Sequence, residues 1–109
     1  MKKILFLALA LCLMAGTAVA ADTIKIGLMA PLTGAWASEG QDMQQIVELL
    51  ADEINTAGGI NGQKIELVWG DDLCAPKDAG TVASKFAADK SIVAVIGHLC
   101  SSATLAAMP

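Results

Sequence analysis

Apolar and polar positions follow two different periods in turn along the chain. Residues 23–30 alternate apolar side chains with polar or small ones, which is typical of a β-strand. A stretch with helical spacing follows, and we expect the helix to begin near Ser38, because Ser38 and Gln41 have the spacing of a capping box. Gly58 and Gly59 are expected to end this helix. Its apolar stripe consists of Met43, Ile46, Val47, Leu50, Ala51 and Ile54.

The alternation of strand and helix then continues to the end of the chain. A second strand is predicted over residues 64–69, and Pro76 suits the first position of a second helix. Residues 92–96 form a continuous apolar run, which is typical of a strand covered on both faces. Residues 97–102 are expected to form a loop, and residues 104–108 the start of a third helix.

This order of elements predicts an α/β fold with a parallel sheet and flanking helices. The last helix is cut short at Pro109, so we expect the chain to be part of a larger protein. A three-stranded sheet has an exposed edge and a thin core, and is not expected to be stable alone. Open sheets of this class bind ligands beyond the carboxyl ends of the strands, where the strand order reverses. With a strand order of 2-1-3, the crevice would lie between the loops of residues 31–40 and 97–102.

Both loops carry candidate ligand contacts. Ser101 and Ser102 precede the third helix, where backbone amides, the helix dipole and a hydroxyl favour an anion such as a carboxylate. The alternative is that one of these serines only caps the helix. Leu99 and Cys100 could contact an apolar ligand side chain or belong to the core. Trp36, in the first loop, could cover a ligand or pack on its own domain.

The first twenty residues have the pattern of a secretory signal peptide. Lys2 and Lys3 precede an apolar segment, residues 4–14, that is short for a membrane span. Small residues then predict cleavage after Ala20, and cleavage after Ala21 fits almost as well. The alternative is a membrane anchor. A lipoprotein signal is rejected because Leu11 precedes Cys12 inside the apolar segment.

Charge and cysteine content narrow the function of the expected mature chain, residues 21–109. This part contains 5 basic and 11 acidic residues, a net charge of −6, which argues against binding to nucleic acid or to an anionic membrane. Cys74 and Cys100 form an even pair in an oxidising compartment, and we predict that they are bridged. Two free thiols or a metal pair are the alternatives, although the spacing fits no zinc motif and His98 is the only histidine.

Signals for catalysis are absent from this sequence. It contains no glycine-rich phosphate loop and no arrangement of nucleophile and base, so we expect a protein that is not an enzyme and has no cofactor. Asp71 and Asp72 are interpreted as a turn and the start of a helix, and His98 as a hydrogen-bonded structural histidine. Glu39 is expected in solvent or in the first helical turn. Trp69 is expected in the core.

Together these motifs resemble the leucine/isoleucine/valine-type periplasmic binding proteins of ABC transporters. The resemblance covers essentially all of the expected mature chain. Cys74 together with residues 97–102, which read GHLCSS, is similar to the branched-chain amino-acid members in particular. The matching stretches are Ile26-Gly27, Pro31-Leu32-Thr33-Gly34, Ile54-Asn55, Gly58-Gly59-Ile60-Asn61-Gly62, Asp71-Asp72, Cys74, Pro76-Lys77, Ala79 and residues 97–104.

The resemblance implies two α/β lobes that close around a ligand, with residues 21–109 as the first part of lobe 1. It also implies a Cys74–Cys100 disulfide near the pocket. Ser101 matches the serine that hydrogen-bonds the ligand carboxylate, and Leu99 and Cys100 match residues of the apolar pocket. The chain departs from the family at Glu39, where an aromatic residue is common before the following glycine. A charge there could shift the preference toward polar amino acids or amides.

We therefore predict a monomeric periplasmic protein that captures a branched-chain amino acid and delivers it to an ABC permease in the inner membrane. The first alternative is a sensory ligand-binding domain of the same fold. The second is an exported α/β enzyme, for which the sequence offers neither a nucleophile nor a metal site.

Overall fold

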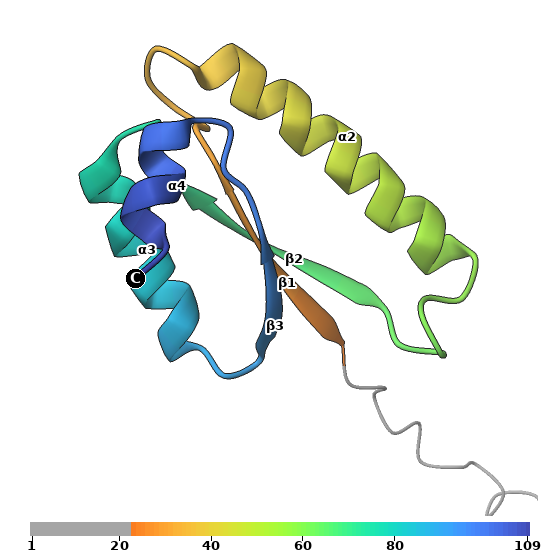
Figure 1. The fold of residues 1–109 in the computed structure, drawn as a ribbon. Helices are drawn as coiled ribbons and strands as arrows, with labels where there is room; N and C mark the ends of the chain where they lie inside the picture. The colour runs from red at the N-terminus through yellow and green to blue at the C-terminus, as the bar shows by residue number, and fades with distance from the viewer. Residues whose placement is uncertain (1–22) are drawn as a thin grey trace, which may run out of the picture.

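The computed structural model describes residues 23–109, so the signal peptide expected over residues 1–20 lies outside the described residues. The described part alternates strands with helices along the whole chain (Figure 1). Its elements are β1 (Ile24–Ala30), α2 (Ala37–Thr56), β2 (Ile65–Asp71), α3 (Pro76–Ala88), β3 (Ile92–Ile96) and α4 (Ser101–Ala107).

The three strands form one parallel sheet with β1 in the centre. Their order is β2-β1-β3, and Leu28 of β1 lies beside Trp69 on one side and Ile96 on the other. The α/β class predicted from the sequence is therefore confirmed, and the strand order is the 2-1-3 arrangement for which the sequence places a crevice between the loops after β1 and β3. The central strand is the best-buried one, since Leu28, Met29 and Ala30 are all almost fully buried.

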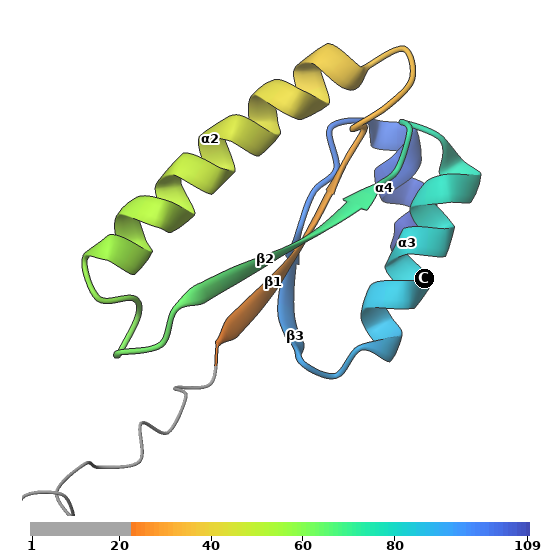
Figure 2. The same ribbon diagram turned by 180° about the vertical axis from the view of Figure 1, so that it is seen from behind.

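Helices cover the two faces of the sheet unequally. Figures 1 and 2 show α2 on one face, with α3 and α4 on the other. Phe86 of α3 lies directly over Gly27 of β1, so closely that an added Cβ at Gly27 would stand 2.7 Å from the ring. Small residues let α3 and α4 approach each other, because Ala79 and Ala103 are both fully buried. The central strand is thus covered on both sides.

The start of α2 differs from the predicted capping box. The helix begins at Ala37 with Trp36 at the N-cap and no side-chain capping bond, so Ser38 lies inside the first turn. Gln41 turns back to the preceding loop instead, and its Nε2 donates to the Leu32 carbonyl at 3.1 Å. The capping-box prediction was wrong because the loop offers Gln41 a different acceptor.

The end of α2 agrees with the sequence. The amide of Gly59 donates to the Ile54 carbonyl at 2.8 Å, and the amide of Gly58 donates to the Asn55 carbonyl at 3.2 Å. This pair of bonds is the Schellman motif, which satisfies the last carbonyls of a helix. Pro76 begins α3, as predicted.

Two element boundaries and one burial prediction need correction. β2 runs beyond Trp69 to Asp71, and α4 begins at Ser101 instead of Thr104. The run 92–96 does form a strand, but it is not covered on both faces, since Val93 is 68% exposed and the rest of β3 is also largely open. The reason is that β3 is an edge strand which, among residues 23–109, contacts α3 but not α2.

Candidate functional site

The carboxyl ends of the three strands lie at one end of the sheet. The loop after β1 (residues 31–36), the loop after β2 (72–75) and the loop after β3 (97–100) therefore meet there (Figures 1 and 2). The strand order reverses between β1 and β3, which is where open parallel sheets bind ligands.

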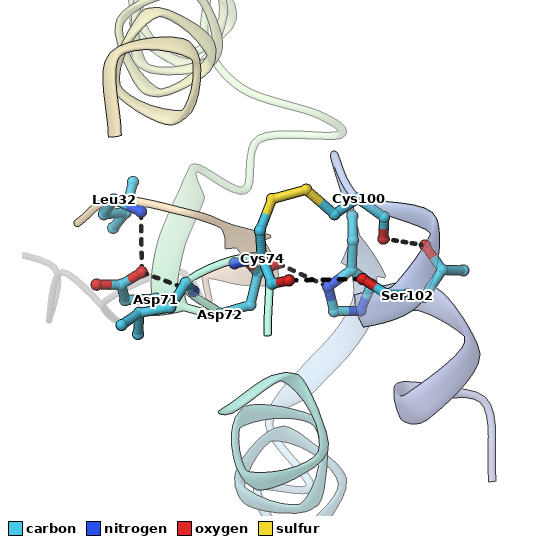
Figure 3. A network of polar contacts seen from close by, with 9 residues as sticks. Leu32, Asp71, Asp72, Cys74, Cys100 and Ser102 are labelled. Carbon is cyan, nitrogen blue, oxygen red and sulfur yellow. Dashed lines mark hydrogen bonds and ion pairs between the residues drawn. A yellow bond between two sulfur atoms is a disulfide. The ribbon is translucent and has the colours of Figure 1, made fainter. Parts of the chain in front are cut away.

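Asp71, the last residue of β2, fixes the loop after β1. Its Oδ1 accepts a hydrogen bond from the Leu32 amide at 2.9 Å, and its Oδ2 accepts one from the Thr33 hydroxyl at 2.5 Å. Oδ1 also accepts from the amide of Leu73 at 3.1 Å, within its own loop. One carboxylate thus ties the first candidate loop to the edge of the sheet (Figure 3).

These hydrogen bonds set the charge state of Asp71. Partial burial acts to raise the pKa of its carboxyl, but hydrogen bonds from Thr33 and from the amides of Leu73 and Leu32 outweigh that effect. The pKa is therefore lowered from its ordinary value of 3.8, because these donors stabilise the ionised form.

Asp72 is fully buried and serves the second candidate loop. Its Oδ2 lies 2.7 Å from Nδ1 of His98, whose side chain is only 6% exposed. Its Oδ1 accepts a hydrogen bond from the Cys74 amide at 2.9 Å, and its own amide donates to the Ala30 carbonyl at 3.1 Å. His98 is therefore the hydrogen-bonded structural histidine that the sequence predicted.

A disulfide joins the same two loops. Cys74 and Cys100 are bonded, with their Cα atoms 5.4 Å apart (Figure 3). This distance lies within the usual range for a bridged pair. The predicted disulfide is confirmed, and the alternatives of free thiols or a metal pair are wrong.

The two serines after this disulfide have different environments. Cys100 occupies the N-cap of α4, so the alternative in which Ser101 or Ser102 caps the helix is wrong. Ser102 Oγ makes a long contact of 3.5 Å to the Cys74 carbonyl (Figure 3). Ser101 is exposed, and its hydroxyl has no hydrogen-bond partner among residues 23–109. Ser101 is thus the serine whose hydroxyl is available.

Apolar side chains near these loops are open to solvent. Leu99 is 41% exposed and Trp36 is 49% exposed, so neither belongs to the core of the described part. Cys100 is half-buried. Glu39 is exposed in the first turn of α2, as expected.

Gly40 explains how closely α2 approaches the loop after β1. It is buried, and an added Cβ would stand 1.9 Å from the Pro31 carbonyl oxygen. No side chain fits between this helix and the loop backbone. Glycine is therefore required here for the close approach that positions the first loop.

Asp71 and Asp72 have roles beyond the turn and helix start that the sequence predicts for them. Each carboxylate holds a different candidate loop. The available signal was their place at the end of β2, where the loops of a parallel sheet meet.

Trp69, which the sequence places in the core, is only half-buried. Its indole nitrogen is buried without a hydrogen-bond partner in the described part of the chain.

The described residues hold no group of three metal-ligating side chains. Over the same range, no helix combines the length and apolar character needed to cross a membrane. A hollow of about 510 Å³ lies between β3 and the helices α3 and α4, and its lining is mainly apolar. It lies on the side of β3 that α3 contacts, and Phe86, Val95 and Met108 are among its lining residues.

Comparison with known proteins identifies the family to which the chain belongs. Residues 23–109 match the family described as periplasmic binding protein. The match covers most of the chain, so the chain belongs to this family.

Individual relatives agree with this assignment. The chain is 48% identical over 101 residues to the leucine-, isoleucine-, valine-, threonine- and alanine-binding protein of Pseudomonas aeruginosa, covering 92% of this chain and 26% of the relative. A branched-chain amino acid transporter substrate-binding protein from Streptococcus pneumoniae, in complex with isoleucine, is 39% identical with a TM-score of 0.73. That match covers 78% of this chain and 24% of the other.

The same fold also occurs with a different ligand. A solute-binding protein of an ABC transporter from Rhodopseudomonas palustris, in complex with 3,4-dihydroxybenzoic acid, is 29% identical with a TM-score of 0.70. The match covers 79% of this chain and 23% of the other. The chain thus spans only about a quarter of the length of these proteins.

Proposed function

We propose that residues 21–109 are the N-terminal part of lobe 1 of a two-lobed binding protein that captures a branched-chain amino acid. The family match supports the binding role, and the relatives named for leucine, isoleucine and valine support the ligand class. The proposed protein binds its ligand without converting it. It acts as a monomer that delivers the ligand to an ABC permease in the inner membrane.

The free hydroxyl of Ser101 carries this proposal. Ser101 is exposed, has no partner within residues 23–109, and lies at the carboxyl end of the sheet beside a disulfide that fixes its loop. We propose that Ser101 donates this hydroxyl to the ligand carboxylate, and that Ser102 lies beside it as a second contact. A charge-assisted bond of this kind is stronger than one between neutral groups.

The apolar part of the ligand would contact the same loops. We propose that Leu99 and Cys100 line its side-chain pocket and that Trp36 covers it from the loop after β1. The half-exposed state of Leu99 and Trp36 supports this role, since both still have apolar surface to bury. The ligand ammonium group would be held by residues beyond this chain, and closure of the second lobe would complete the site.

Export is the second part of the proposal. The family supports a periplasmic location, and we propose that residues 1–20 direct export and are removed after Ala20. The mature protein should then begin at Ala21, which N-terminal mass analysis of periplasmic protein would show. A mature protein that still carried residues 1–20 would contradict this part.

A ligand screen tests the proposed function. The complete mature protein would be heated with single amino acids, small amides and 3,4-dihydroxybenzoate, and its Tm followed. A ligand that binds only the folded state raises the Tm with concentration. Leucine, isoleucine or valine should raise it. A response to amides or to 3,4-dihydroxybenzoate alone would overturn the ligand class, and no response at all would overturn the binding role.

Ser101→Ala tests the assigned contact. Loss of one hydrogen bond to a charged group costs about 1.5–3 kcal/mol, so leucine affinity should fall about tenfold to a hundredfold. Ser84→Ala is the matched control, because Ser84 is an exposed helical serine whose hydroxyl bonds only to the Gly80 carbonyl. Equal affinities for the two variants would remove Ser101 from the site.

A further inference from the structure

We propose that Asp72 and His98 are positioning residues for the ligand site, acting in parallel with the Cys74–Cys100 disulfide. Their hydrogen bond would hold the loop after β3 in the shape that presents Ser101. This inference rests on the function proposed above and adds to it two residues that do not touch the ligand.

Both cross-links join the same two loops. The disulfide connects Cys74 to Cys100, and the hydrogen bond connects Asp72 to His98, each over a sequence separation of 26 residues. A single cross-link leaves one loop able to pivot about the bridge. A second cross-link, two residues earlier in each loop, removes that freedom.

Asp72 is well placed to serve as the fixed end of this link. Its side chain is fully buried, and both carboxylate oxygens are engaged, one by His98 and the other by the Cys74 amide. Its backbone amide donates to the Ala30 carbonyl at the end of the central strand. Asp72 therefore ties both loops to the most buried strand of the sheet.

The bond to His98 is one that the buried carboxylate needs. An ionised carboxylate only accepts hydrogen bonds, so a carboxylate at Asp72 requires the tautomer of His98 that carries a proton on Nδ1. Removing the histidine would leave a buried carboxylate oxygen without a donor, which costs more than the loss of an exposed hydrogen bond. The loop would then rearrange to restore a donor.

Such a rearrangement would be passed on to Ser101. Gly97 presses against β1, since an added Cβ there would stand 2.4 Å from the Met29 carbonyl oxygen. The loop is thus held in succession at Gly97, His98 and Cys100, and Ser101 follows directly. If the hydrogen bond of His98 is lost, the loop after β3 is held only at its two ends, Gly97 and Cys100.

Replacement of His98 in the complete binding protein tests the proposal. The amide of Asn can place a donor where Nδ1 stands, whereas Gln reaches toward the position of Nε2 and Leu offers no donor. L-leucine affinity, measured by calorimetry well below each Tm, should fall about tenfold in His98→Leu and His98→Gln, the size expected for one buried charged hydrogen bond. It should stay close to the wild-type value in His98→Asn.

Asn55→Ala is the matched control for a purely structural effect. Asn55 makes two hydrogen bonds to the backbone of Ile65, at the opposite end of β2 from the loops. Its loss should lower the Tm and leave leucine affinity unchanged. The proposal is overturned if His98→Gln and Asn55→Ala change affinity alike, or if His98→Asn binds leucine no better than His98→Gln.

A second readout needs no ligand. Reduction of a disulfide depends on access of the attacking thiolate to a sulfur atom. Dithiothreitol should reduce Cys74–Cys100 faster in His98→Gln than in wild type or His98→Asn. If leucine fails to bind wild type but this difference in rate is found, the proposed function fails and the positioning pair stands. Equal reduction rates in all three proteins would overturn the pair itself.

Discussion

Asp71 and Asp72 are chemically identical neighbours with different tasks. Successive side chains of an extended chain point in opposite directions. The carboxylate of Asp71 therefore reaches the loop after β1, and that of Asp72 reaches His98 after β3. A pair of acids at the end of β2 can in this way fix the two loops that flank the expected ligand crevice.

Asp71 gives the protein an acid-sensitive contribution to stability. Its folded pKa lies below the ordinary value of 3.8, so its stabilising effect is fully present above that value. The effect is lost as the pH falls through the lower folded pKa, because the native state must then take up a proton. We expect wild type to lose stability more steeply than Asp71→Asn below about pH 4.

Urea unfolding at a series of pH values measures this difference. Asp89 also has a lowered pKa, chiefly through hydrogen bonds from Ser91, but it is present in both proteins and cancels in the comparison. A difference between wild type and Asp71→Asn that does not change with pH would show that Asp71 acts only through neutral hydrogen bonding.

Gly40 should respond to alanine in the opposite sense to an ordinary helical glycine. In a helix interior, Gly→Ala usually stabilises by about 1 kcal/mol. At Gly40 the new Cβ would meet the Pro31 carbonyl, which is backbone and cannot move aside. We expect Gly40→Ala to destabilise by about 2 kcal/mol, as overpacking does.

Gly80 provides the comparison for this prediction. It lies within α3, and an added Cβ there would have no neighbour closer than the Ala106 carbonyl at 3.8 Å. Gly80→Ala should therefore raise the free energy of unfolding. Chemical denaturation of both variants checks the pair, and a stabilising Gly40→Ala would show that the loop after β1 is free to shift.

Some site residues could be predicted at this scale and others could not. Cys74 and Cys100 were predictable because two cysteines in an exported chain have few other roles. The bond between Asp72 and His98 was not, because nothing local to either residue indicates the other. The strand order and the depth of burial at Asp72 bring them together, and both depend on the whole sheet.

At the scale of elements, hydrophobic periodicity predicted the order of strands and helices. The first turn of α2 was misplaced because local spacing suggested a capping pair, whereas Gln41 found an acceptor in Leu32. The burial of β3 was misjudged for a related reason. The apolar sequence of β3 is compatible with burial on both faces of the sheet. Whether its side chains are buried depends on which helices lie beside the strand.

The disulfide is a covalent constraint between the loop after β2 and the loop after β3. It closes a loop with a sequence separation of 26 residues, for which chain entropy gives about 3–4 kcal/mol of stabilisation. We expect the double substitution Cys74→Ser with Cys100→Ser to lower the free energy of unfolding by that amount. Denaturant unfolding measures it, with the reduced wild-type protein as control. A loss well under 1 kcal/mol would indicate that the hydrogen bond between Asp72 and His98 already restrains the loops.

At the scale of the whole described unit, many large apolar side chains are exposed to solvent. Three large side chains of α2, Ile46, Leu49 and Leu50, are each more than half exposed. β3 adds a second apolar area with an unpaired edge among residues 23–109. Contiguous apolar surface of this kind normally marks a place where further protein packs. The other large exposed apolar side chains are Trp36, Ile54, Ile60, Leu73, Val93, Val95, Ile96, Leu99, Leu105 and Met108.

This surface predicts how residues 21–109 behave when produced alone. Because the edge of β3 is unpaired and one side of α2 is exposed, the segment buries little apolar area. The stabilisation from this burial is small compared with the conformational entropy that the chain loses on folding. We expect the isolated segment to melt without a cooperative transition and to bind a hydrophobic dye. The same residues within the complete protein should melt sharply and bind little dye, because further chain would cover both areas. A sharp transition of the isolated segment would instead show that the helices covering the two faces of β1, together with the disulfide, are sufficient for a stable core.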